Sequence, residues 1–214
     1  MQLDRDGAQL YPAALGAAGI AALTDLLSTH AENARLGPAL GLANLIAPAD
    51  AIAASVLGPR ARPVRAIFFD KSRDRNWALG WHQDRTIAVR ERVEAPGFTD
   101  WTVKSGIHHC VPPFGYLERT LTLRLHLDDT GVDNAPLLIA PGTHRLGRIA
   151  EPEIPQAVER HGTDTCLAKA GDIWAYSTPI LHASDRAGTP LRRRVLQILY
   201  SAEVLGGGLE WLGV

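Results

Sequence analysis

The side chains with the clearest chemical potential in this sequence are two histidines and one aspartate. His82 and Asp84 are separated by one residue at the start of a predicted strand, where alternate side chains point to the same face. His182 follows another predicted strand much further along the chain. Two histidines and one carboxylate on one side of a metal form the facial triad of non-haem Fe(II) oxygenases, with positions left for a 2-oxo acid and O2. A His-x-Asp alone is weak evidence, because the same tripeptide also occurs as a surface histidine near a strand end.

A second feature is Arg193, which opens an apolar strand near the end of the chain. The distal carboxylate of a metal-bound 2-oxo diacid would be buried, and an arginine fork can hold it with two charge-assisted hydrogen bonds. Arg193 shares a predicted strand face with Val195 and Gln197. Arg192 and Arg194 would face the opposite way. A slip of one residue would make Arg192 the ligand instead, so the choice between the two arginines stays open.

The elements that must position these residues are helices in the first third of the chain and short strands after it. Hydrophobic residues at helical spacing predict helices over residues 17–30 and 48–57, and a short helix is expected over 153–160. The predicted strands cover residues 64–69, 86–92, 121–127, 136–141, 165–169, 173–176 and 193–201. In the run 121–127, leucines alternate with Thr122, Arg124 and His126, so the polar face could line an internal chamber.

This order of elements indicates a mainly β fold with some α, a double-stranded β-helix (jelly roll, cupin-like) buttressed by N-terminal helices. No repeat and no linker interrupts the chain. We therefore expect a single domain over residues 1–214, in which residues 1–63 are mostly helical support and residues 64–202 form the jelly-roll core.

The composition excludes several classes of partner. The 214 residues carry a net charge of −1, which gives no overall field that would attract nucleic acid or an anionic membrane. No apolar run is long enough to span a bilayer, and the polar, acidic N-terminus differs from a signal peptide. Cys110 and Cys166 form no CxxC motif and are expected to be reduced. We expect a cytoplasmic protein that acts on a small-molecule substrate, with no nucleic acid or membrane partner.

Taken together, these motifs resemble the phytanoyl-CoA dioxygenase (PhyH) family of Fe(II)/2-oxoglutarate-dependent oxygenases, which includes ectoine hydroxylases. The resemblance covers about residues 81–201, with a looser match in the helical N-terminus. It rests on the segments WHQD (81–84), LHLDD (125–129), NAPL (134–137), PGTH (141–144), GD (171–172), HAS (182–184) and the arginines before Val195. The family usually has Asn-Gly where this chain has Asn134-Ala135, so that turn is expected to be reshaped.

The resemblance implies the roles of seven residues. The implied iron ligands, which are also the catalytic residues, are His82, Asp84 and His182. The implied co-substrate residues are Arg193, as the ion-pair partner of 2-oxoglutarate, and Gln83, Ser184 and Trp101, as lining of its pocket. With Fe(II) as cofactor and 2-oxoglutarate and O2 as co-substrates, the implied reaction hydroxylates or otherwise oxidises a small organic metabolite and releases succinate and CO2.

Two alternative functions fit part of the pattern. A jelly-roll metalloenzyme could use a divalent ion as a Lewis acid without 2-oxoglutarate, and such an enzyme would not need Arg193. A non-catalytic metabolite-binding module with a vestigial metal site is the other alternative, although the intact triad argues against it.

For the remaining histidines and Trp211 the sequence predicts only a position. His108 and His109 are expected in a solvated or gating loop, and Trp211 on the surface or against another subunit. Substrate specificity is expected to lie in residues 91–113 and in the N-terminal helices. The sequence leaves the substrate and the oligomeric state open.

Overall fold

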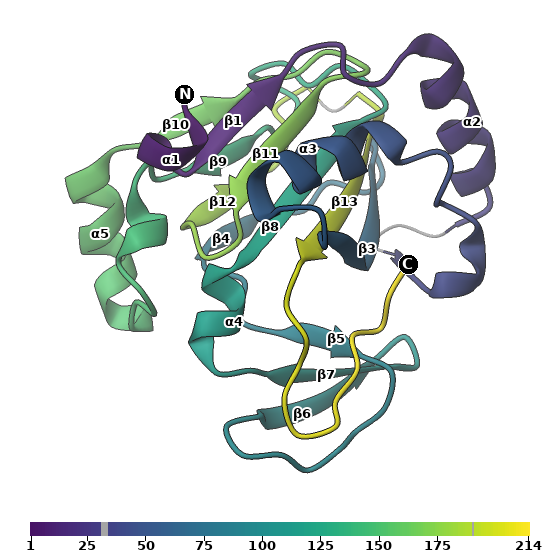
Figure 1. Cartoon of the computed structure of the whole chain (residues 1–214). Coiled ribbons are helices and arrows are strands. Elements are labelled where there is room, and N and C mark those ends of the chain that lie inside the picture. Colours follow the sequence, from purple (N-terminus) through teal and green to yellow (C-terminus); the bar gives the residue numbers. More distant parts are fainter. Residues whose placement is uncertain (31–33, 190) are drawn as a thin grey trace.

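The computed structural model describes residues 1–30, 34–189 and 191–214, and its strands form two main antiparallel sheets (Figure 1). A six-stranded sheet has the strand order β1-β11-β8-β13-β3-β2, and a four-stranded sheet has the order β10-β9-β12-β4. A third sheet, β5-β7-β6, lies beside them. This arrangement confirms the predicted jelly roll.

The element bounds are as follows. The six-stranded sheet contains β1 (Ala8–Tyr11), β2 (Ala34–Leu36), β3 (Arg62–Lys71), β8 (Thr120–His126), β11 (Ile173–Ser177) and β13 (Arg193–Ser201). The four-stranded sheet contains β4 (Leu79–His82), β9 (Leu137–Ile139), β10 (Asp164–Cys166) and β12 (His182–Ser184). The third sheet contains β5 (Ile87–Val89), β6 (Thr99–Lys104) and β7 (Ile107–Val111). The helices are α1 (Leu3–Asp6), α2 (Ala17–Leu27), α3 (Ala47–Leu57), α4 (Phe114–Glu118) and α5 (Ile154–His161), and 3-10 turns cover Pro38–Leu40, Thr143–Arg145 and Glu151–Glu153.

Strand alternation gives the six-stranded sheet one apolar and one polar face. On β13, Leu196, Ile198 and Tyr200 are buried in the main hydrophobic cluster, while Arg193 and Gln197 face the other way. The polar face of β8 is also buried, so Arg124 and the other polar residues of that strand line the interior rather than the outer surface. The alternation read from residues 121–127 is therefore confirmed.

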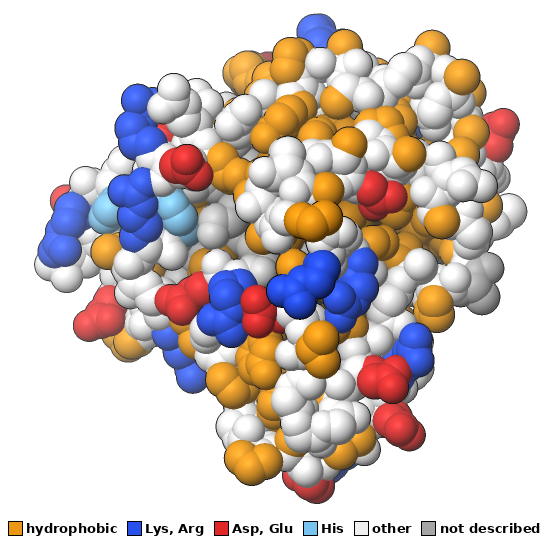
Figure 2. Space-filling view, viewed as in Figure 1, with side chains coloured by type: hydrophobic (Ala, Val, Ile, Leu, Met, Phe, Trp, Pro, Cys, Tyr) orange, Lys and Arg blue, Asp and Glu red, His pale blue; other side chains and the backbone are white. Residues whose placement is uncertain are grey.

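Helices α2 and α3 cover the apolar face of this sheet, as expected, and Figure 1 shows α3 lying across it. Leu23 and Leu27 of α2 and Ile52 of α3 are buried against it, and such burial stabilises the fold by roughly 1.5–3 kcal/mol per side chain. The Tyr200 hydroxyl donates to Asp50 Oδ1 at 2.8 Å, which joins β13 to α3. Apolar side chains are also plentiful on the outer surface over α2 and α3 (Figure 2).

The N-terminal 63 residues contribute to the sheet as well as covering it. β1 pairs with β11, and β2 pairs with β3, so two short strands from the expected helical support extend the sheet at both edges. In the turn before β9, Ala135 has a φ of 52°, a left-handed conformation that glycine adopts without strain. The turn therefore takes a glycine-like backbone at the position where the family usually has glycine.

Three expectations on single residues are corrected. His108 and His109 lie in strand β7, which pairs with β5 and β6, and His109 is buried rather than solvated. Trp211 is also buried, and its Nε1 donates to the Glu203 carbonyl at 2.9 Å. Trp211 belongs to the hydrophobic cluster that packs the third sheet against Val64 and Leu199 of the jelly roll. Among the described residues, no helix has the length and apolar character needed to cross a bilayer.

Candidate metal centre

His82 and His182 meet because β4 and β12 are hydrogen-bonded neighbours in the four-stranded sheet. The two residues are direct partners in the β4–β12 register, and their ring centroids are 4.3 Å apart. The Nδ1 atom of His82 bonds the Gly80 carbonyl at 2.8 Å, and that of His182 bonds the Ile180 carbonyl at 3.0 Å. Both rings thereby keep Nε2 as the basic nitrogen that can bind a metal.

Asp84 completes the group just after the end of β4. One ligand atom from each of His82, Asp84 and His182 lies within 4.8 Å of the others, which is close enough to hold one ion. Arg65 Nη2 donates to Asp84 Oδ2 at 3.2 Å, and Arg65 Nη1 donates to the Thr86 carbonyl at 3.0 Å. Arg65 therefore fixes the orientation of the carboxylate through an ion pair and through the chain that follows it.

The electrostatics of the three groups favour binding of a cation. Burial, together with the neighbouring His82, lowers the pKa of His182 to about 4, so its ring is neutral at physiological pH. Burial opposes ionisation of Asp84, but its ion pair with Arg65 and the adjacent imidazoles lower the pKa of that carboxyl. Two imidazole nitrogens and a carboxylate form the donor set that suits Fe(II).

The triad opens into a cavity of about 330 Å³ between the two main sheets. Arg65, Ile67, Phe69 and Lys71 alternate along β3 and all face it. Its lining includes six Lys or Arg side chains, which are Arg35, Arg65, Lys71, Lys104, Arg124 and Arg193. Asp84 is the one acidic residue that lines it in the described part of the chain, so the cavity attracts anions.

Three of these cations, Lys71, Arg124 and Arg193, are buried on the neighbouring strands β3, β8 and β13. Arg193 is 2% exposed, and within the described part of the chain its Nε and Nη1 have no hydrogen-bond partner. Arg193 lies opposite Lys71 in the β3–β13 register. Burial and Arg124 lower the pKa of Arg193 to about 9, and burial together with the two arginines lowers that of Lys71 to about 8. A buried guanidinium with unused donors indicates a place for an anionic ligand.

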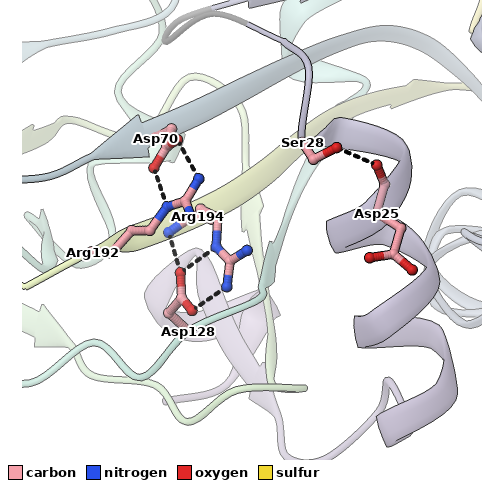
Figure 3. A network of polar contacts seen from close by, with 6 residues as sticks. All are labelled: Asp25, Ser28, Asp70, Asp128, Arg192 and Arg194. Atoms are coloured by element: carbon pink, nitrogen blue, oxygen red, sulfur yellow. Dashed lines mark hydrogen bonds and ion pairs between the residues drawn. The ribbon is translucent and has the colours of Figure 1, made fainter.

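The neighbouring arginines of β13 turn to the other side of the strand. Arg192 forms an ion pair with Asp70 at 3.0 Å, and Arg194 forms one with Asp128 at 2.7 Å (Figure 3). The predicted register of this strand is therefore confirmed. Arg193, and not Arg192, faces the cavity.

Ser184 is also brought to this cavity, as the resemblance implied. Its hydroxyl accepts from Lys71 Nζ at 3.3 Å and donates to the Ala135 carbonyl at 3.2 Å. The structure therefore collects five of the seven sequence-predicted residues in one cavity, namely the triad, Ser184 and Arg193.

Gln83 and Trp101 lie elsewhere. The Gln83 amide donates to the carbonyls of Gly147 and Pro179 and accepts from the Ile149 amide, so its polar atoms hold the backbone behind β4. Trp101 lies on β6 and packs against the hydrophobic cluster beneath the third sheet. Neither residue is among those that line the cavity.

Sequence reasoning placed Arg124 on an inward face but missed the cavity cations Arg35, Arg65, Lys71 and Lys104. Arg65 could have been found from the alternation of the predicted strand at residues 64–69, and Lys71 continues that alternation. Arg35 and Lys104 carried no comparable signal, since the strands that hold them were not predicted.

One family model matches this chain. The family model of phytanoyl-CoA dioxygenase (PhyH) matches residues 5–195, most of the chain. No curated protein matches the sequence.

Solved structures match at low sequence identity. EctD from S. alaskensis in its apo form has a TM-score of 0.70 at 19% identity, covering 93% of this chain and 74% of its own. AviO1 from Streptomyces viridochromogenes Tue57 has a TM-score of 0.66 at 18% identity, covering 93% and 91%. The epimerase SnoN, in complex with Fe3+, alpha ketoglutarate and nogalamycin RO, has a TM-score of 0.63 at 17% identity, covering 99% and 92%. These likenesses establish the shared fold.

Proposed function

Because the chain belongs to the phytanoyl-CoA dioxygenase (PhyH) family, we propose that it is an Fe(II)- and 2-oxoglutarate-dependent oxygenase that oxidises a small organic metabolite. Succinate and CO2 are the expected products of the co-substrate. His82, Asp84 and His182 hold the iron in this proposal, and Arg193 holds the distal carboxylate of 2-oxoglutarate. When bound, the iron and 2-oxoglutarate supply the oxidising power that protein side chains lack.

The observation that carries the proposal is the buried guanidinium of Arg193, which lines the same cavity as the triad. Leaving the donors of a buried charged group unused is costly, so a ligand of opposite charge is expected there. A Lewis-acid metalloenzyme needs the triad but has no use for this second feature. SnoN, which was crystallised with Fe3+ and alpha ketoglutarate, adds support from the same fold.

The remaining side chains have orienting roles. Arg65 keeps the Asp84 carboxylate in place, and the carbonyls of Gly80 and Ile180 fix the two imidazole rings. Lys71 and Arg124 add positive charge beside Arg193, which favours a dicarboxylate over a neutral ligand. The protein's own contribution is therefore to bind and orient the reactants.

The test is anaerobic addition of Fe(II) and 2-oxoglutarate to the metal-free protein, followed by visible absorption spectroscopy. We expect a weak charge-transfer band that neither component gives alone, because the band requires a 2-oxo acid chelated to the iron. Asp84→Ala should remain folded by circular dichroism and lose the band. A folded wild-type protein that binds iron but shows no band would contradict the proposal and favour the Lewis-acid or binding-module alternative.

A further inference from the structure

A second group of positive charges lies in the cavity apart from the buried cations around Arg193. Arg35 on β2 is half-buried and pairs with Ile67 in the β2–β3 register. Its Nε has no hydrogen-bond partner among the residues that the structure describes. Lys104, at the end of β6, is exposed and reaches the cavity from the third sheet. Both therefore belong to the open side of the cavity, on elements outside the β3–β8–β13 core.

The effects of Arg35, Arg65 and Lys104 on neighbouring pKa values indicate that these charges lie near one another. Burial is the main cause that lowers the pKa of the His109 ring, and Arg65, Arg35 and Lys104 lower it further. Burial and Arg65 likewise lower the pKa of Arg35. The positive fields of the two strand arginines and Lys104 thus converge around His109, whose Nδ1 is already bonded to the Ile107 carbonyl at 2.9 Å.

The proposed position of the co-substrate leaves this second group of charges without an assigned role. Arg65 is engaged by Asp84, and Lys71, Arg124 and Arg193 surround the position proposed for the distal carboxylate of 2-oxoglutarate. Arg35 and Lys104 remain, and no described acid of the cavity lining pairs with either of them. Cations gathered in a partly enclosed site repel one another, which is a cost that an anionic ligand would remove.

We propose that the primary substrate carries an anionic group, a carboxylate, sulfonate or phosphate, which Arg35 and Lys104 bind while the rest of the molecule extends toward the triad. This inference rests on the proposed function and adds the chemical class of its substrate. The wall between the two ends of the cavity includes Ile67, Phe69 and Leu79, so the reacting part of the substrate meets apolar side chains.

The experiment measures binding by isothermal titration to the anaerobic protein loaded with Fe(II) and 2-oxoglutarate. The probes are small monocarboxylates, sulfonates and phosphate monoesters, each paired with its neutral amide, sulfonamide or alcohol. The variants are Arg35→Gln and Lys104→Gln. Arg60→Gln is the matched control, because Arg60 is exposed and lies outside the cavity lining.

We expect at least one anionic probe to bind more tightly than its neutral counterpart by about tenfold or more, as a charged hydrogen bond gives roughly 1.5–3 kcal/mol. Arg35→Gln and Lys104→Gln should each reduce that preference and leave the affinity for 2-oxoglutarate near the wild-type value, while Arg60→Gln should change neither. Equal binding of paired probes, no binding of any anionic probe, or a loss of 2-oxoglutarate affinity in Arg35→Gln would overturn the inference.

The proposed function is tested separately in the same samples. Absence of the charge-transfer band in the wild type would contradict the oxygenase assignment. A wild type that shows the band but has no preference for anionic probes would overturn only the assignment of an anionic substrate.

Discussion

Arg193 is the residue on which the assignment of 2-oxoglutarate depends, because it is a buried cation without a described partner for two of its nitrogens. Arg193→Ala should raise the 2-oxoglutarate concentration needed for half-saturation by roughly thirtyfold to several thousandfold, since losing one partner of a shielded charge pair costs about 2–5 kcal/mol. Iron affinity should stay near the wild-type value. Titration of the charge-transfer band measures both.

Arg192→Ala is the matched control for this change. Arg192 is a neighbour in sequence, but its side chain is more than half exposed and pairs with Asp70 outside the cavity. We expect it to alter 2-oxoglutarate affinity little. If Arg192→Ala abolished binding and Arg193→Ala had no effect, Arg192 would be the anchor in the working protein.

Arg65 offers a separate test of how the protein holds its metal ligands. Arg65→Met removes the hydrogen bond to Asp84 and should weaken iron binding by roughly tenfold to a hundredfold, the usual effect of losing a partner of a metal ligand. Arg65→Lys should recover part of the loss, because it keeps the charge but not the fork. Anaerobic titration with Fe(II) gives the affinities. Unchanged Fe(II) affinity in Arg65→Met would show that Arg65 is not needed to orient the Asp84 carboxylate.

The sequence predicted some of these side chains and not others, for physical reasons. Strand alternation predicted that Arg193 faces inward but left a slip of one residue open. Both faces of β13 are packed in the structure, and this packing specifies the register. Alternation could not predict the position of the Gln83 side chain, because its amide forms hydrogen bonds with three backbone groups from distant segments. It also could not place Trp101, since the path of β6 depends on its pairing with β7.

The segment before α2 is tied to the sheet at the turn that leads into β11. The Leu15 amide donates to the Gly171 carbonyl at 2.9 Å, and the Ala13 amide donates to Asp172 Oδ1 at 2.8 Å. Gly171 has a φ of 93°, and a Cβ added there would lie 2.5 Å from the Leu15 carbonyl oxygen. Only glycine fits both the backbone conformation and the close approach.

Gly171→Ala should therefore lower the free energy of unfolding by roughly 2–4 kcal/mol, through backbone strain and displacement of the N-terminal segment. Urea denaturation followed by circular dichroism measures the change. Gly188→Ala is the control, because a Cβ there meets nothing within 4 Å and its φ is not left-handed, so its effect should stay within about 0.5 kcal/mol. Equal stability of the two variants would show that the N-terminal segment is not held at Gly171.

Element prediction succeeded where the local pattern and the tertiary packing agree. The strand at residues 193–201 and the helix at 48–57 are long, strongly patterned and buried on one side, and the structure contains both. The short strands β1, β2, β4, β6, β7 and β12 were missed. Of these, β1 and β2 owe their conformation to hydrogen bonds with distant strands rather than to their own sequence.

The stability of the whole molecule should depend on pH through His126. This ring is buried on β8, its Nδ1 bonds Thr130 Oγ1 at 3.1 Å, and its Nε2 has no partner among the residues described. Burial, with the charges of Arg124 and Arg193, lowers its pKa well below the usual 6.5. The folded state thus favours the neutral ring, so this stabilisation is present above pH 6.5 and is lost as pH falls toward the folded-state pKa.

Between pH about 7.5 and pH about 5.5, the metal-free wild type should lose about 1.4 kcal/mol more unfolding free energy than His126→Gln, which cannot take up a proton. Urea denaturation of both proteins at the two pH values gives the difference. Buried His182 adds a parallel loss in both proteins, so it does not affect the comparison. Equal losses would mean that the pKa of His126 is the same in the folded and unfolded states.

The direct pairing of His82 with His182 means that a bound ion would affect the stability of the folded chain. An ion bound to both residues closes a loop of about 100 residues, as a disulfide would, and so restricts the unfolded chain. The metal is thus a removable cross-link between the middle of the sequence and its end. Stripping it should speed amide hydrogen exchange in β4 and β12, while β8, which lies between β11 and β13 under the helices, keeps its protection.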